Sequence, residues 1–261
     1  MNGRNIIGSI GKILRLPKAE IRILMYHRVN PRNDLPDNHI SVTPEAFERQ
    51  MLWIKENNWQ VISLESAVRQ LKSGTVQSNK QIVITFDDGY QDNYQFAYPI
   101  LRRFKFPAII FLAVQACFNN EDEFLNLLQM KEMLSEDISF GAHTVTHPFL
   151  TEISYYQSVK EIFESKQILE EKLNIPIQSF AYPAGYFNQH HRYLTMQADY
   201  ECALSIRPGG NRPGEDLYAL RRTEIARHDS LLDFKNKLQG GFDMPHLVRQ
   251  YLTGLYPAPQ I

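Results

Sequence analysis

The sequence predicts an α/β protein, an irregular (β/α) barrel of about seven parallel strands in a single domain. Short apolar segments alternate along the chain with amphipathic segments of helical periodicity. Continuous apolar runs are typical of strands buried on both faces, as in a parallel sheet covered by helices. Repeated strand–helix units in 261 residues favour a barrel over an open sheet, and barrels of that length are commonly one domain.

Strand candidates are the segments rich in aliphatic and β-branched residues. In chain order they are residues 21–26, 59–62, 81–86, 107–114, 138–142, 179–182, 202–205 and 218–225. The longest apolar run, residues 106–114, is far shorter than the roughly 18 residues that cross a bilayer. The sequence therefore predicts buried strands and no membrane-spanning segment.

Helices are expected between these strands, and residues that favour helix ends mark them. Thr43-Pro44-Glu45 is typical of an N-cap, an N1 proline and a first-turn acid. Ser63 is expected to cap a short helix that ends near Gly74. Ser154 and Gln157 match a capping box, which predicts the start of a long amphipathic helix.

The composition excludes several classes of protein. Hydrophobic residues make up 43% of the chain and charged residues 22%, which rules out a disordered protein. The 28 lysines and arginines against 29 aspartates and glutamates give a net charge of −1, so no cationic excess is available to hold nucleic acid. Cys117 and Cys202 lie among apolar neighbours and are expected to be buried thiols.

Both ends of the chain are expected to lie outside the main domain. Residues 1–20 form an N-terminal arm, residues 21–235 the domain and residues 236–261 a C-terminal extension. Glycine and lysine interrupt the apolar residues of the arm and no cleavage site follows, so it is not a secretory signal. A cytoplasmic protein is therefore expected. The arm either packs on the domain or lies as a short helix on an anionic membrane surface, in peripheral contact.

Residues 85–89, Thr-Phe-Asp-Asp-Gly, place two adjacent carboxylates at the end of an apolar strand. Like-charge repulsion and desolvation make this arrangement unfavourable unless a cation lies nearby. An acidic helix N-terminus is the alternative, since aspartate also caps helices. The apolar strand before Asp87 and Asp88 favours a cation site.

The second motif, His143-Thr-Val-Thr-His147, follows the strand candidate at 138–142. We expect it on a helical turn that Pro148 ends, because residues four apart on such a turn face the same way and can share a metal ion. A barrel brings the carboxyl ends of its strands to one rim, so the histidines and the aspartates should meet there. Taken alone, an incidental pair of histidines is the alternative.

Two histidines and one aspartate leave an open position on a divalent ion for water and substrate. The second aspartate is then available as a base. This division of roles suits metal-assisted hydrolysis, in which the ion lowers the pKa of bound water and polarises an acyl oxygen.

The two motifs, in this order and about 55 residues apart, resemble those of the polysaccharide deacetylases with a NodB-homology domain. The resemblance covers about residues 20–230 and implies an irregular (β/α) barrel. It implies that Asp87 is the general base and that one divalent metal ion, usually zinc, is held by Asp88, His143 and His147. The implied substrate is an acetylated glycan that loses N-acetyl or, less often, O-acetyl groups.

The third family motif differs here. Ala181 stands where many members have an arginine that orients the base, and Arg221 or Arg222 is expected to substitute for it. Residues 180–185, Phe-Ala-Tyr-Pro-Ala-Gly, are similar to the form in the branch that acts on poly-N-acetylglucosamine and related exopolysaccharides.

By that resemblance Tyr182, Pro183 and Ala184 lie at the substrate, and the Ala184 N–H helps to bind the developing oxyanion. A main-chain donor suits this role because it does not depend on side-chain identity.

The proton donor to the leaving amine is left open between two histidines. Many family members use a late histidine, and Arg227-His228-Asp229 is a partial match to that region. His27 is the alternative, because Met25-Tyr26-His27 is similar to the exopolysaccharide branch. A pKa near about 6.5 suits either residue, and a surface or packing histidine is the other interpretation of each.

Two other functions fit the same motifs. A non-catalytic carbohydrate-binding relative would explain Ala181, but it would not need an open metal site. A deacylase or deformylase of a lipid-linked sugar would share the chemistry and use the N-terminal arm as its docking element.

Overall fold

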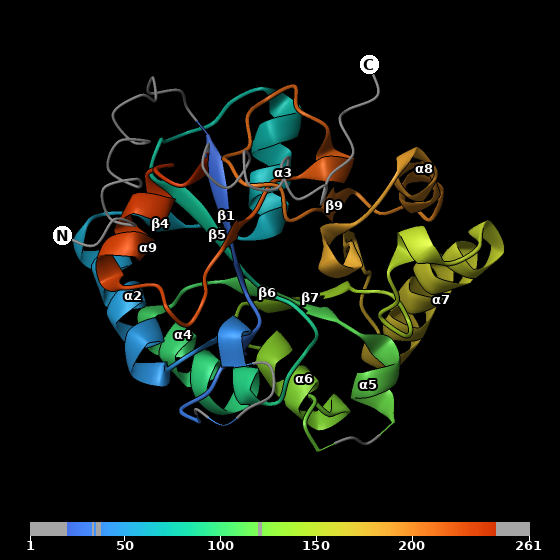
Figure 1. Cartoon of the computed structure of the whole chain (residues 1–261), viewed down its shortest axis with the longest axis horizontal. Coiled ribbons are helices and arrows are strands. Elements are labelled where there is room, and N and C mark those ends of the chain that lie inside the picture. The colour runs from blue at the N-terminus through green and yellow to red at the C-terminus, as the bar shows by residue number, and fades with distance from the viewer. Residues whose placement is uncertain (1–19, 33, 35–37, 120–121, 244–261) are drawn as a thin grey trace.

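The computed structural model describes residues 20–32, 34, 38–119 and 122–243, and its centre is a curved parallel sheet surrounded by helices (Figure 1). The strands of this sheet are β1 (Ile21–Tyr26), β4 (Gln60–Val61), β5 (Gln81–Phe86), β6 (Ala108–Leu112), β7 (Ile138–Ala142), β8 (Ser179–Ala181), β9 (Cys202–Leu204) and β10 (Thr223–Glu224). Their order is β10-β1-β5-β6-β7-β8-β9, with β4 beside β5. All these pairings are parallel, which confirms the predicted α/β barrel: seven strands follow one another in this order, and the short β4 is an eighth beside β5.

The helices around the sheet are α2 (Pro44–Glu56), α3 (Leu64–Ser73), α4 (Tyr98–Phe104), α5 (Val114–Phe118), α6 (Leu127–Leu134), α7 (Tyr155–Leu173), α8 (Gln189–Gln197) and α9 (Leu231–Leu238). The predicted caps are confirmed. Thr43 and Ser63 accept backbone N–H groups at the starts of α2 and α3, and Gly74 ends α3 in the left-handed region at φ 80°. Ser154 and Gln157 form the capping box of α7.

Shorter elements complete the described chain. A separate two-stranded pair joins β2 (Arg28–Val29) to β3 (Ser41–Val42). Single 3-10 turns lie at Asn38–Ile40, Leu150–Glu152, Pro183–Gly185 and Leu217–Ala219, and a π-helical turn at Asn93–Ala97 leads into α4.

Alternate residues of β5 belong to two separate cores, as expected of a strand covered on both faces. Ile82, Ile84 and Phe86 pack in the larger cluster, beneath the surrounding helices. Val83 packs in a smaller cluster with the apolar face of α3. The same alternation turns the following residue, Asp87, away from the outer helices and toward the inside of the barrel.

The predicted strand at 218–225 is wrong over most of its length. Residues 217–219 form the 3-10 turn, and only Thr223–Glu224 pairs with β1. The backbone between them first contacts the segment after β9, where the Ser205 N–H donates to the Leu220 carbonyl at 2.8 Å, and then pairs with β1. This crossing segment closes the gap between β9 and β1, and it cannot form one ladder with either strand.

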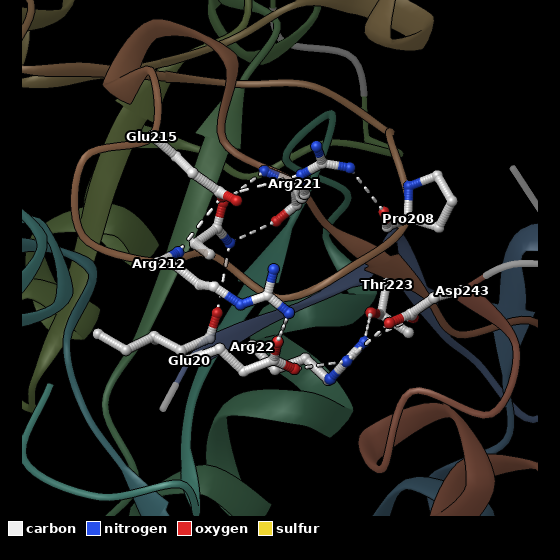
Figure 2. Close-up of polar contacts among 10 residues, drawn as sticks. Glu20, Arg22, Pro208, Arg212, Glu215, Arg221, Thr223 and Asp243 are labelled. Atoms are coloured by element: carbon white, nitrogen blue, oxygen red, sulfur yellow. Dashed lines mark hydrogen bonds and ion pairs between the residues drawn. The ribbon is translucent and has the colours of Figure 1, made fainter. Parts of the chain in front are cut away.

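The predicted domain boundary at residue 235 falls inside α9. Helix α9 continues to Leu238, and Phe242 is buried. Figure 2 shows how the two ends of the described chain meet, because the buried Arg22 guanidinium binds both Glu20 and Asp243 at 2.8 Å. The folded unit therefore extends at least to Asp243. The rest of the predicted arm and extension, including the expected membrane contact, lies outside the described residues.

Cys117 and Cys202 are both buried and form no disulfide, as expected. Within the ranges that the structure describes, no helix combines the length and the apolar composition needed to cross a membrane.

Candidate active site

The strand register brings the predicted site residues to one rim of the barrel. Tyr26 pairs with Phe86, and Ala142 pairs with Phe180. The residues that follow these strands therefore emerge at the same level, among them His27, Asp87 and His143.

Asp88, His143 and His147 converge as the sequence predicts. Asp88 Oδ1 lies 3.3 Å from His147 Nε2 and 3.6 Å from His143 Nε2. The three candidate ligand atoms all lie within 4.8 Å of one another. These distances would let one ion contact a carboxylate oxygen and two imidazole nitrogens.

The two histidines do not lie on a helical turn, so that part of the prediction is wrong. Thr144 and His147 have left-handed φ values of 66° and 58°, which an α-helix cannot contain. The loop folds back on the buried Thr144, whose hydroxyl donates to the His143 carbonyl at 2.5 Å and accepts from the His147 N–H at 3.0 Å. This loop conformation places the ring centroids of His143 and His147 4.8 Å apart.

The backbone fixes which nitrogen of His143 faces the site. Nδ1 lies 2.7 Å from the Ala181 carbonyl, and because a carbonyl only accepts, Nδ1 carries the proton. The lone pair of a neutral ring is then on Nε2, which faces Asp88. Burial is the main cause that lowers the pKa of His143 to about 4, so the ring is neutral near pH 7.

Asp88 has the surroundings of a metal ligand. Its Oδ1 is buried and has no hydrogen-bond donor among the described residues. Burial alone would raise the pKa of Asp88, but the neighbouring histidines outweigh it and lower that pKa. A buried carboxylate oxygen without a donor is costly unless a cation reaches it. One oxygen and two imidazole nitrogens fit a divalent ion such as Zn²⁺, with a position left open.

Arg222 holds Asp87, which settles the choice between Arg221 and Arg222. The fully buried guanidinium of Arg222 binds both carboxylate oxygens at 2.6 and 2.8 Å, and its Nε donates to the Ser205 carbonyl at 2.9 Å. Arg221 instead faces Glu215 and the Pro208 carbonyl (Figure 2). The guanidinium that Ala181 lacks is thus supplied from the segment before β10.

This pairing also sets the charge of Asp87. Burial raises the pKa of Asp87, but Arg222 and, to a smaller extent, His143 outweigh burial and lower it. The carboxylate is ionised and oriented, with Oδ2 4.0 Å from His143 Nε2.

The two candidate acids lie in different surroundings. His27 is half-buried and directly follows Tyr26, whose carbonyl accepts the Asp87 N–H at 3.0 Å, so the two segments run side by side at the rim. Its Nδ1 is buried without a hydrogen-bond partner in the part of the chain that the structure describes. His228 is exposed on the turn between β10 and α9.

The residues of the third motif lie in or next to the core. The Tyr182 ring is fully buried, stacks on Phe187 at 4.3 Å and donates its hydroxyl to the Tyr218 carbonyl at 3.0 Å. The Tyr182 ring is therefore part of the packed core. Pro183 is also buried, whereas Ala184 is half-buried with a left-handed φ of 50°. A strained non-glycine residue at this rim is consistent with a functional backbone.

Three amides at the start of α5 join the two loops of the site, and sequence reasoning missed them. The Ala113 N–H donates to the Asp88 carbonyl at 3.3 Å. The Val114 and Gln115 N–H groups donate to carbonyls of the histidine loop at 3.2 and 2.8 Å. No motif marks main-chain donors of this kind, because they depend on how the loops pack.

Comparisons with known proteins agree with this geometry. The family model described as polysaccharide deacetylase matches residues 74–203. Over 208 residues the chain is 31% identical to YxkH of Bacillus subtilis, which its name assigns to the polysaccharide deacetylases, and the match covers 80% of this chain and 72% of that protein. Over 238 residues it is 25% identical to a poly-beta-1,6-N-acetyl-D-glucosamine N-deacetylase of Staphylococcus epidermidis, with 82% of each chain covered.

A solved structure of a deacetylase has the same fold as this chain. The Streptococcus pyogenes deacetylase PplD, solved in complex with acetate, matches with a TM-score of 0.79 at 29% identity, over 86% of this chain and 99% of that chain. Fold, motifs and relatives therefore agree: the chain belongs to the polysaccharide deacetylase family of hydrolases.

Proposed function

We propose that this protein is a metal-dependent hydrolase that removes N-acetyl groups from a polysaccharide. The observation that carries the proposal is the convergence of Asp88, His143 and His147 beside an aspartate held by a buried arginine. Binding a sugar needs no such arrangement, whereas hydrolysis of an amide needs an activated water, a base and an acid.

Asp88, His143 and His147 would hold the metal, and zinc suits their donor atoms. When bound, the ion supplies Lewis-acid polarisation of the acyl oxygen and a lower pKa for the attacking water. Asp87 takes a proton from that water while the water oxygen forms a bond to the acyl carbon. Arg222 keeps the carboxylate ionised before this transfer and holds it in place during the transfer.

The remaining steps involve a backbone N–H and a histidine at the rim of the barrel. Negative charge develops on the acyl oxygen, and the Ala184 N–H donates to it. The carbon–nitrogen bond then breaks, and the leaving nitrogen takes a proton from a histidine. We assign this acid to His27, since it is half-buried and its strand runs beside the segment that carries Asp87, whereas His228 is exposed. The products are acetate and a free amine on the sugar.

Aromatic side chains next to the site support a glycan substrate. Phe149 follows the histidine loop and is 48% exposed, and its ring meets that of Tyr186, just after Ala184, at 5.8 Å. Apolar faces of sugar rings stack on aromatic rings of this kind. The relatives named as N-deacetylases of poly-beta-1,6-N-acetyl-D-glucosamine favour an N-acetylated polymer over an O-acetylated one.

Acetate release tests the proposal. The purified protein is incubated with oligomers of β-1,6-linked N-acetylglucosamine and with chito-oligosaccharides, before and after treatment with a chelator. We expect release that the chelator abolishes and added Zn²⁺ restores, and that is absent in His143→Ala. Chelator-insensitive release, or none from any acetylated glycan with metal bound, would overturn the proposal.

A further inference from the structure

We propose that Glu161 of α7 is a positioning residue that sets the metal affinity of the site by holding the histidine loop, residues 143–147. The inference rests on the proposed metal site. It concerns a carboxylate that neither motif contains and that is not one of the three residues that converge as candidate metal ligands.

Within the described residues, the Glu161 side chain makes its hydrogen bonds to this loop. Oε2 accepts the Val145 N–H at 2.7 Å and the Thr146 N–H at 2.9 Å. Oε1 accepts the Thr146 hydroxyl at 2.6 Å. One side chain on a 19-residue helix thus binds both backbone donors in the centre of the loop.

The opposite side of the loop is held by α5. The Thr144 and Val145 carbonyls accept the Val114 and Gln115 N–H groups. The loop is therefore bound on both sides, its N–H groups by a carboxylate and its carbonyls by amides. Of these two supports, only Glu161 acts through a side chain, so only Glu161 can be removed by substitution.

The two histidines depend on this support to different extents. The His143 side chain is 2% exposed and is fixed by the Ala181 carbonyl. The His147 side chain is 40% exposed, so packing does little to place it. Its backbone is left-handed, as is that of Thr144, and such residues persist only where the surroundings hold them. Without Glu161, the loop would relax and His147 Nε2 would leave its place beside Asp88.

Glu161→Met tests this role, because methionine keeps the helix propensity and approximate size but accepts no hydrogen bond. The Kd for Zn²⁺ is measured by competition with a chromophoric chelator. We expect it to rise by about 10- to 100-fold, the usual cost of losing a group that orients a metal ligand. Glu164→Met is the matched control, since Glu164 is exposed on the same helix, and its Kd should stay within about twofold of wild type.

Two conservative variants separate position from charge. Glu161→Gln keeps an oxygen for the two N–H groups and an NH₂ group for the Thr146 hydroxyl, so it should retain most of the affinity. Glu161→Asp keeps the charge but is one methylene too short, so it should lose affinity. The proposal is overturned if Glu161→Asp binds like wild type while Glu161→Gln does not, a pattern that remains readable even if the methionine variant fails to fold.

The Co²⁺ absorption spectrum of each variant gives a second readout, and it should differ from wild type in Glu161→Met and match wild type in Glu164→Met. Unchanged Zn²⁺ affinity in folded Glu161→Met would remove the role of Glu161 and leave the metal site intact. Absence of Zn²⁺ and Co²⁺ binding by the wild-type protein would instead overturn the proposed function itself.

Discussion

At the scale of single residues, two adjacent aspartates occupy different surroundings. Both oxygens of Asp87 are bound by Arg222, whereas Oδ1 of Asp88 faces two imidazoles and has no donor among the described residues. Pairs of acids whose surroundings differ in this way divide their roles. A carboxylate aimed by a guanidinium suits a base, and one that lacks donors suits a metal ligand.

Asp87→Asn tests this division. The amide cannot take a proton from water, so we expect kcat to fall by about 10²- to 10⁴-fold. Zn²⁺ affinity should change little, since Asp87 is not among the ligands, whereas His143→Ala should lose it. Acetate release and Zn²⁺ titration measure the two properties separately. Full activity of Asp87→Asn with metal bound would show that another group is the base.

Arg222→Lys tests how the base is kept ionised. Burial raises the pKa of Asp87 and Arg222 lowers it, so a lysine that cannot bind both oxygens should let that pKa rise. The base works only when ionised, and activity is lost as the pH falls through its pKa. The acid limb of the pH profile of kcat/KM should therefore move to higher pH.

The control for this substitution is the neighbouring Arg221→Lys, whose profile should match wild type because Arg221 faces Glu215 and Pro208 instead of Asp87. A uniform loss in Arg222→Lys without a shift would contradict the role in ionisation.

His27→Gln should slow release of a sugar amine by about 10²-fold or more, because glutamine cannot donate a proton as an acid does. An aryl acetate, whose leaving group departs without a proton, should be hydrolysed by His27→Gln at nearly the wild-type rate. His228→Gln is the comparison and should affect neither substrate. If His228→Gln shows the selective loss instead, the two assignments are exchanged.

At the scale of elements, the sequence predicted the helix ends and strands that depend on interactions between residues close together in the chain. The capping box of Ser154 and Gln157 and the αL glycine at Gly74 involve neighbours in the chain, so residue type and spacing reveal them. The apolar runs of β1 and β5 are likewise visible, because these strands are buried on both faces.

Elements shaped by distant contacts were not predictable in the same way. Thr144, a β-branched residue, lies in the left-handed region because its hydroxyl and two packed helices hold the loop there. Spacing alone favoured a helical turn for His143 and His147. Arg222 could be named as a candidate, but its choice over Arg221 depends on how the segment before β10 crosses between two strands.

The elements that flank the site also present the proposed sugar-stacking pair. Phe149→Ala and Tyr186→Ala should each raise KM for a long N-acetylated oligomer by about 5- to 50-fold, corresponding to about 1–2 kcal/mol of stacking, with a smaller change in kcat. Tyr156→Ala is the control, because Tyr156 is 69% exposed on α7 with its ring beside Lys160. Equal KM values in all three variants would exclude Phe149 and Tyr186 from the substrate-binding surface.

At the scale of the whole molecule, buried charges join the two ends of the described chain to the barrel. Arg22, near the start of β1, binds both Glu20 and Asp243, whereas the active-site residues follow the ends of the strands. A second buried pair lies nearer the rim, where Lys237 of α9 binds Asp229 at 2.5 Å and the Glu224 carbonyl at 2.7 Å. Helix α9 therefore stabilises the segment that carries β10, although the predicted domain boundary cuts through it.

Lys237→Met tests whether α9 belongs to the folding unit. The substitution keeps the length of the side chain but removes the ammonium that neutralises Asp229, and both side chains are at most 2% exposed. Breaking a buried pair on one side costs about 3–5 kcal/mol, so urea unfolding should show a loss of that order in the free energy of unfolding.

The control is Lys131→Met, at an exposed position of α6, which should cost less than about 0.5 kcal/mol. Adding Asp229→Asn to Lys237→Met should restore part of the loss, because the buried negative charge that Lys237 faced is then removed as well. Equal stability of Lys237→Met and Lys131→Met would mean that α9 packs on the barrel without contributing to its cooperative unfolding.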